Sequence, residues 1–99
     1  MNDEQVERVR ELLAAVPPGR VTTYGDLAAA AGLNSPRIVG RILAEDSADL
    51  AWHRVVHADG RPAPHKVDEQ LQRLRAEGIQ IRNERVDIDV TRWRWDDAM

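Results

Sequence analysis

The 99-residue chain contains no cysteine. This absence excludes disulfide bonds, thiolate metal sites and thiol nucleophiles at the same time. The chain also lacks any apolar run near the roughly 20 residues that cross a bilayer, and its first residues do not have the pattern of a secretory signal. We therefore expect a cytoplasmic protein without a membrane role, built as one domain over residues 1–99.

Excess positive charge is also absent, since the formal net charge is −3. Nucleic-acid-binding proteins usually carry a basic footprint, so this balance argues mildly against such a function. The charge is nevertheless uneven. Acidic residues concentrate near the two ends, whereas residues 20–43 and 51–66 each carry three arginines or lysines against one aspartate. Both segments are locally positive and are candidates for phosphate contacts.

A first helix is predicted over residues 3–16 from apolar residues spaced three and four apart, with Asp3 as its N-cap. Pro17, Pro18 and Gly19 follow it. Proline cannot continue the helical hydrogen-bond ladder and glycine tolerates a turn, so we expect the chain to change direction there.

Two further short helices are predicted next. Thr22 or Thr23 can cap the first of them, which continues to Ala31. Ser35 can cap the second, with Pro36 in the first helical position, where proline is favoured. The turn between the two helices contains glycine, which fits a helix-turn-helix unit.

The second helix of this pair leaves Arg37 and Arg41 outside its apolar stripe. Exposed arginines on such a helix are typical of helix-turn-helix proteins that bind DNA. Many three-helix cores show the same pattern without touching DNA. This region alone therefore leaves both interpretations open.

The second half of the chain predicts a mixture of short elements. Residues 50–56 and the turn signal at 58–60 predict a small hairpin or wing, and residues 66–77 predict the last clear helix. Alternating apolar residues over 79–90 predict short strands or extended packing, with Trp93 and Trp95 covering the core. The predicted fold is mainly α, a winged-helix-like helix-turn-helix domain with a short β hairpin or wing.

The most informative segment is AWHRVVHADG at residues 51–60, in which Trp52 stands beside His53 and Arg54 just before a turn. A surface tryptophan next to cations can stack on a nucleic acid base. The alternative is a core tryptophan with a capping histidine, which the segment by itself favours.

Four stretches together resemble a known family. They are VTTYGDLA at 21–28, RIVG at 37–40, WHRVV at 52–56, and residues 71–78. The chain resembles the DNA-binding domain of the alkylguanine DNA alkyltransferases, and more closely the alkyltransferase-like proteins. In the repair enzymes the position of Trp52 is a cysteine that takes the alkyl group irreversibly, and in the alkyltransferase-like proteins it is commonly tryptophan.

This resemblance implies a non-catalytic protein without cofactor or metal. Dealkylation needs a thiolate, and an indole has no comparable nucleophilicity. His53 and Glu77 match positions that help to deprotonate the cysteine of the enzymes through a water. In this chain they are expected to form a structural polar pair.

The resemblance also implies roles in DNA binding and base flipping for Tyr24, Arg37 and Arg41. Tyr24 would press on the target phosphate and Arg37 would enter through the minor groove to fill the vacated stack. Arg41 would bind phosphate.

A pocket for the flipped alkylguanine is implied as well, and its expected lining is Trp52, His53, Arg54, Val55 and His65. The implied partners of this expected monomer are duplex DNA containing O6-alkylguanine and proteins of nucleotide excision repair. Two alternatives stay open. One is a winged-helix DNA-binding regulator without lesion preference, and the other is an enzyme of undefined reaction built on His53 and Glu77.

Overall fold

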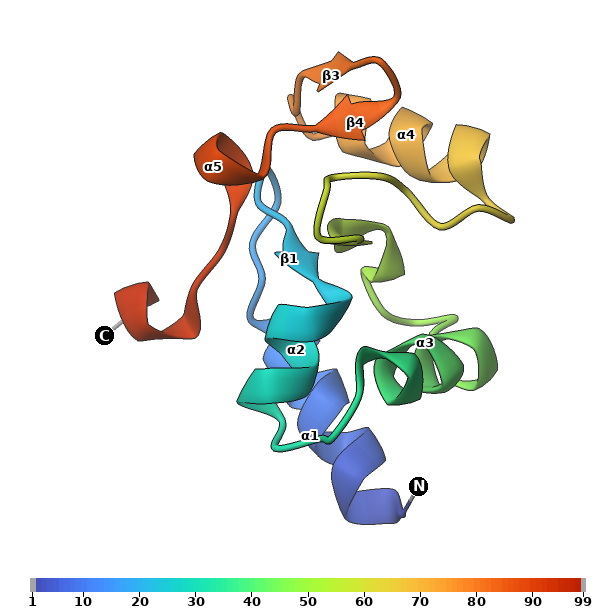
Figure 1. Cartoon of the computed structure of the whole chain (residues 1–99), viewed down its shortest axis with the longest axis vertical. Helices are drawn as coiled ribbons and strands as arrows, with labels where there is room; N and C mark the ends of the chain where they lie inside the picture. Colours follow the sequence, from blue (N-terminus) through green and yellow to red (C-terminus); the bar gives the residue numbers. More distant parts are fainter. Residues whose placement is uncertain (1, 99) are drawn as a thin grey trace.

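The computed structural model describes residues 2–98. Figure 1 shows α1, α2 and α3 at one end of the molecule and α4 with β3 and β4 at the other. The mainly helical fold is as predicted, and within residues 2–98 no helix is long and apolar enough to span a membrane. The α-helices are α1 (Asp3–Ala14), α2 (Tyr24–Ala30), α3 (Pro36–Glu45), α4 (Val67–Ala76) and α5 (Ile88–Thr91), the 3-10 helices are η1 (Trp52–Arg54) and η2 (Trp95–Ala98), and the strands are β1 (Thr22–Thr23), β2 (Val55–Val56), β3 (Ile81–Arg82) and β4 (Arg85–Val86).

The N-cap of α1 is Asn2, so the prediction of Asp3 was wrong by one residue. Asn2 Oδ1 accepts a hydrogen bond from the Gln5 backbone N–H at 2.8 Å, and Gln5 Oε1 accepts one from the Asn2 N–H at 3.1 Å. This reciprocal capping box satisfies two amide groups that otherwise lack partners. Asp3 lies instead in the first turn, where its negative charge interacts favourably with the positive end of the helix dipole.

The helix-turn-helix unit is confirmed in α2 and α3. Thr23 caps α2 by accepting from the Asp26 N–H at 2.9 Å, and Ser35 caps α3 by accepting from the Arg37 N–H at 3.1 Å. Pro36 occupies the first turn of α3 as predicted. Buried residues of both helices, among them Leu27 and Val39, join the main hydrophobic cluster.

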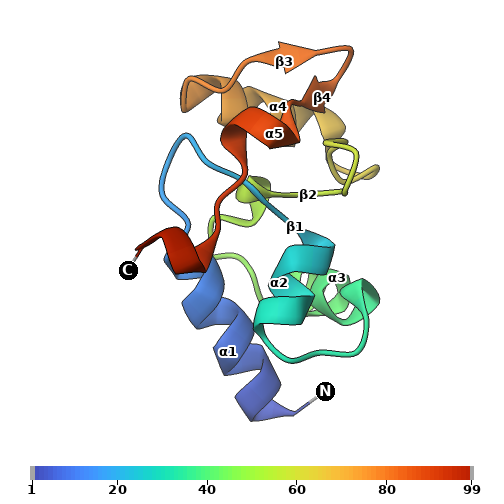
Figure 2. The same ribbon diagram turned by 60° about the vertical axis from the view of Figure 1, so that its left-hand side comes forward.

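The hairpin predicted near residues 50–60 lies elsewhere. β2 pairs instead with β1 in parallel, with Thr22 opposite Val55, and Figure 2 shows the two strands side by side. The antiparallel hairpin is β3–β4. Pro62 and Pro64 follow the turn after β2 and have no N–H to donate, so that segment cannot form the second strand of a hairpin.

The C-terminal tail covers the core with Trp93 and Trp95, as predicted. Trp95 Nε1 donates a hydrogen bond to the Leu12 carbonyl at 2.8 Å, which attaches the tail to α1. Part of the segment predicted to be extended is helical, because the Asp87 side chain accepts from the Asp89 N–H at 3.1 Å and caps α5.

A partly buried ionic cluster around Glu77, the C-cap residue of α4, joins three segments of the chain. His53 Nε2 lies 2.6 Å from Glu77 Oε2, Arg54 Nη2 donates to the same oxygen at 2.8 Å, and the Gly19 N–H donates to Oε1 at 3.1 Å. Arg54 also donates to the Val16 carbonyl at 2.9 Å. Burial alone would raise the pKa of Glu77, but the bonds from Arg54, His53 and Gly19 lower it to about 2.

Gly60 provides a test of the contact between the turn after β2 and the hairpin. Its φ is +87°, and a Cβ there would overlap the Val86 carbonyl oxygen. We expect Gly60→Ala to lower the free energy of unfolding by about 2 kcal/mol or more, as measured by urea denaturation. Gly78→Ala is the matched control, because φ is +85° and the space is open. It should cost only about 1 kcal/mol, so equal losses would contradict this account.

The Glu77 cluster predicts a specific pH dependence. Because the folded pKa of about 2 lies below the ordinary value of 4.5, the unfolded chain takes up the proton first as the pH falls. The stabilisation is complete above about pH 5 and is lost as the pH falls toward 2. We expect Glu77→Gln to lower the free energy of unfolding at pH 7 by about 2 to 3 kcal/mol. The melting temperature of this variant should depend less on pH between pH 5 and pH 2 than that of the wild type. The exposed Glu4→Gln serves as control, and an equal acid sensitivity of the Glu77→Gln variant and the wild type would oppose the assignment.

Candidate nucleic-acid interface

A cavity of about 350 Å³ opens between α3, η1 and the loop that precedes α4. Its walls combine apolar and polar side chains in nearly equal measure, so it offers both contact surface and hydrogen-bonding groups to a ligand. The structure brings together here three residues singled out from the sequence, Tyr24, Trp52 and His65. The full lining is Tyr24, Gly40, Leu43, Ala44, Ser47, Trp52, Ala63, His65 and Lys66.

Trp52 is held in the wall of this cavity by two cations. Lys66 Nζ lies 4.7 Å from the centroid of the indole ring and Arg73 Cζ lies 5.5 Å from it. The electron-rich face of an indole attracts cations, so both groups stabilise the orientation of the ring. His53 meets the ring edge-on, with centroids 6.2 Å apart. Unlike Trp93 and Trp95, Trp52 is not packed against the main hydrophobic cluster.

His53, Arg54 and Val55 were predicted to line the same pocket as Trp52 and His65, and the structure separates them from it. Val55 is fully buried in the main hydrophobic cluster. His53 and Arg54 extend to Glu77, and neither lines the cavity. The 3-10 geometry of η1 explains the division, because with three residues per turn successive side chains point in different directions around the helix.

Tyr24 begins α2 and contributes its ring to the cavity. The ring packs against the His57 imidazole, with centroids 4.9 Å apart and a tilt of 40°. Burial raises the pKa of the Tyr24 hydroxyl above its ordinary value of 10. The hydroxyl, protonated at neutral pH already at its ordinary pKa, can donate a hydrogen bond.

Arg37 and Arg41 both lie exposed on α3, the helix that forms one wall of the cavity. Arg41 Nε lies 3.4 Å from Glu45 Oε1, one helical turn along. Arg37 has no carboxylate partner within residues 2–98. The Arg37 guanidinium at the start of α3 is available to an anion or a base.

Gln70 and Lys66 are site residues that were not predicted from the sequence. Gln70 is fully buried; its Oε1 accepts from the Ala63 N–H at 2.7 Å, and its Nε2 donates to the carbonyls of His53 and Val55 at 3.0 and 2.7 Å. It therefore fixes the backbone on two sides of the cavity. A signal was present, because Gln70 precedes Leu74 by four residues and so shares the buried face of α4.

Comparisons with known proteins identify the family. Residues 4–79 match the family described as 6-O-methylguanine DNA methyltransferase, DNA binding domain. The chain is 42% identical to the DNA base-flipping protein of Escherichia coli strain K12 over 94% of this chain and 75% of that protein. It is 30% identical to alkyltransferase-like protein 1 of Schizosaccharomyces pombe over 80% of each.

Solved structures agree with these matches. The fold superposes on the crystal structure of S. pombe Atl1 in complex with damaged DNA containing O6-carboxymethylguanine, with a TM-score of 0.85 at 24% identity over 95% of this chain and 98% of that chain. It also matches the O6-methylguanine-DNA methyltransferase of Pyrococcus kodakaraensis strain KOD1, with a TM-score of 0.66 at 36% identity over 75% of this chain and 46% of that chain. The chain thus belongs to the family of the 6-O-methylguanine DNA methyltransferase DNA-binding domain, among its alkyltransferase-like, DNA base-flipping members.

Proposed function

We propose that this protein binds O6-alkylguanine in duplex DNA, flips the damaged nucleotide out of the helix and holds it beside Trp52 without removing the alkyl group. The observation that carries the proposal is a tryptophan fixed in the wall of the α3 cavity of a chain that has no cysteine. Trp52 takes the position of the nucleophile of the repair enzymes. Alkyl transfer then has no acceptor.

The dimensions and chemistry of the cavity support a flipped base as its ligand. A volume of about 350 Å³ falls within the usual range for small-molecule pockets, about 300 to 1,000 Å³. The indole of Trp52 offers an apolar wall to the alkyl group, and the His65 imidazole offers stacking or a hydrogen bond to the base. The proposed ligand of the cavity is therefore an alkylated guanine that has rotated out of the base stack of duplex DNA.

Base flipping needs groups that replace the lost stacking. Extrusion costs a few kcal/mol, and a planar cation inserted into the gap offsets part of this cost. Arg37 is suited to this role because it is exposed at the start of α3 and has no carboxylate partner in residues 2–98. Tyr24 presses on the target phosphate with a protonated hydroxyl, and Arg41 contacts the backbone.

His53 and Glu77 serve as structure in this proposal. Their direct contact of 2.6 Å and the two-pronged bond from Arg54 leave the carboxylate fully engaged behind η1. The pair stabilises the position of η1, the segment that carries Trp52. Without a thiol to activate, it has no proton to move during binding.

The lesion survives this binding, so its removal requires an enzyme that cuts it out of the strand. We assign that step to nucleotide excision repair, with this protein, a monomer of one domain over residues 1–99, marking the site. The protein itself requires no cofactor or metal for such a role.

Lesion preference is the decisive measurement. We expect the protein to bind a duplex containing O6-methylguanine at least about tenfold more tightly than the same duplex containing guanine, because a weakened base pair is easier to open. Mass spectrometry of the bound DNA should recover the alkyl group intact. Equal affinities would favour a regulator without lesion preference, and alkyl loss would show an enzyme.

Arg37→Ala separates flipping from simple attraction to phosphate. We expect binding to a damaged duplex to weaken about 10- to 100-fold, and binding to a strand with an already exposed O6-methylguanine to change little. Arg41→Ala, on the same helix, should weaken both ligands alike and reduce the salt dependence. A uniform loss in Arg37→Ala would contradict the flipping role of Arg37.

A further inference from the structure

The β3–β4 hairpin carries two arginines in an unfavourable arrangement. Asn83 and Glu84 form its two-residue turn with φ of 52° and 58°, the backbone that tight hairpins require. This register places Arg82 directly opposite Arg85. Like charges at opposed positions destabilise a β pair, and within residues 2–98 neither arginine has an ion-pair partner. The arrangement is suited to an anionic ligand.

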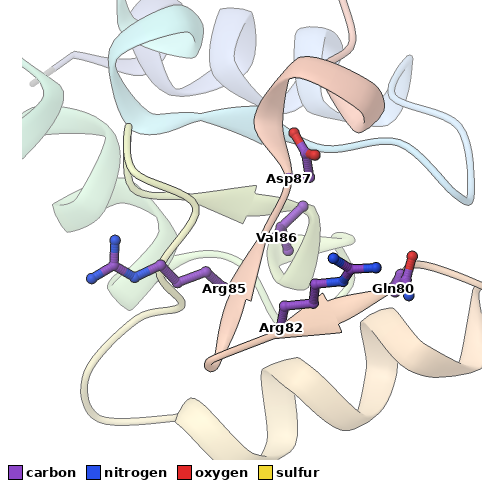
Figure 3. A pocket seen from close by; sticks show the side chains of 5 residues that line it. All are labelled: Gln80, Arg82, Arg85, Val86 and Asp87. Carbon is purple, nitrogen blue, oxygen red and sulfur yellow. The ribbon is translucent and has the colours of Figure 1, made fainter.

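The side chains around the hairpin form two adjoining hollows. Arg82 and Arg85 line one of about 340 Å³ together with Gln80 and Asp87, and Figure 3 shows the two guanidinium groups extending in opposite directions from the hairpin. Arg85 also lines a second hollow of about 470 Å³ that it shares with Arg61.

Three arginines and two carboxylates line these hollows, and they are Arg61, Arg82 and Arg85 against Glu84 and Asp87. Asp59 lies 3.3 Å from Arg61, and the Arg61 backbone N–H, followed by the charges of Arg61 and Arg85, lowers the pKa of Asp59. Asp59 thus offsets Arg61, and the Asp87 side chain already accepts the hydrogen bond that caps α5. The guanidinium groups of Arg82 and Arg85 remain without an ion pair in residues 2–98.

The hairpin is attached to the α3 interface through a short series of contacts. The Val86 N–H donates to the Gly60 carbonyl at 3.0 Å, and the His57 N–H donates to the Arg61 carbonyl at 2.9 Å. The His57 ring in turn packs on Tyr24. Figures 1 and 2 both place the turn of the hairpin on the side of the molecule where α3 lies. The longest extent of the protein is 36 Å, about one turn of B-form DNA.

We propose that the β3–β4 hairpin and the loop between β2 and α4 form a second DNA contact. In this contact Arg61, Arg82 and Arg85 bind backbone phosphates of the duplex that flanks the flipped nucleotide. The inference rests on the proposed function, which brings DNA to α3. Guanidinium groups are suited to phosphate because of their fixed fork of donors. Arg82 and Arg85 lie beyond residues 4–79, the part of the chain that matches the family, whereas Arg61 lies within it.

The double variant Arg82→Gln/Arg85→Gln tests the second contact. On an O6-methylguanine duplex of about 24 base pairs, we expect the slope of log affinity against log salt to fall by about 1 to 2, with affinity at low salt reduced about 5- to 50-fold. On a duplex of about 8 base pairs, too short to reach the hairpin, the variant should bind like the wild type. The ratio of affinities for alkylated and normal guanine should be unchanged, because phosphate contacts carry no base information.

The control is Arg8→Gln/Arg94→Gln, which changes the net charge equally on exposed residues of α1 and the tail and should leave the salt slope unchanged. Melting temperatures report on folding, and removing the opposed charges should keep or raise that of the hairpin variant. A wild-type salt slope and affinity of the hairpin variant on the long duplex would overturn the inference. If the wild type bound alkylated and normal duplexes equally, the proposed function would be refuted but the hairpin contact would not. The difference in salt slope between the wild type and the hairpin variant would still report that contact.

Discussion

The carboxylate of Glu77 is the charge around which the segments behind the cavity are organised. It accepts hydrogen bonds from the turn after α1 and from η1, while Arg54 reaches on to the end of α1. A buried carboxylate is stable only where donors compensate its lost hydration. Since η1 carries Trp52, the wall of the cavity depends on an ionic cluster on its opposite side.

A net charge of −3 is compatible with this interface because electrostatic recognition is local. At physiological salt, charges are screened beyond about 8 Å, so a phosphate responds to the side chains within its reach rather than to the whole protein. Several acidic groups are already engaged within the fold, such as Asp49 with Arg10 and Asp26 with Arg92. The exposed guanidinium of Arg37 has no ion pair in residues 2–98 and can therefore attract a nearby anion.

Features set by neighbouring residues could be predicted from the sequence, and features set by distant ones could not. The caps at Thr23 and Ser35 were found because each depends on an amide group two or three residues away. The parallel β1–β2 pair joins residues more than 30 positions apart, so no turn signal announced it. In the cavity, the resemblance directed attention to Trp52, whereas Gln70 and its hydrogen bonds to the backbone depend on how α4 docks.

The two cations that flank Trp52 have a consequence for the order of events during binding. Lys66 and Arg73 belong to α4 and its N-cap, so the indole is oriented by the folded protein before any ligand arrives. A wall prepared in advance saves the entropy of ordering side chains at the moment of capture. A ligand that enters the cavity therefore meets an aromatic surface that needs no rearrangement to receive it.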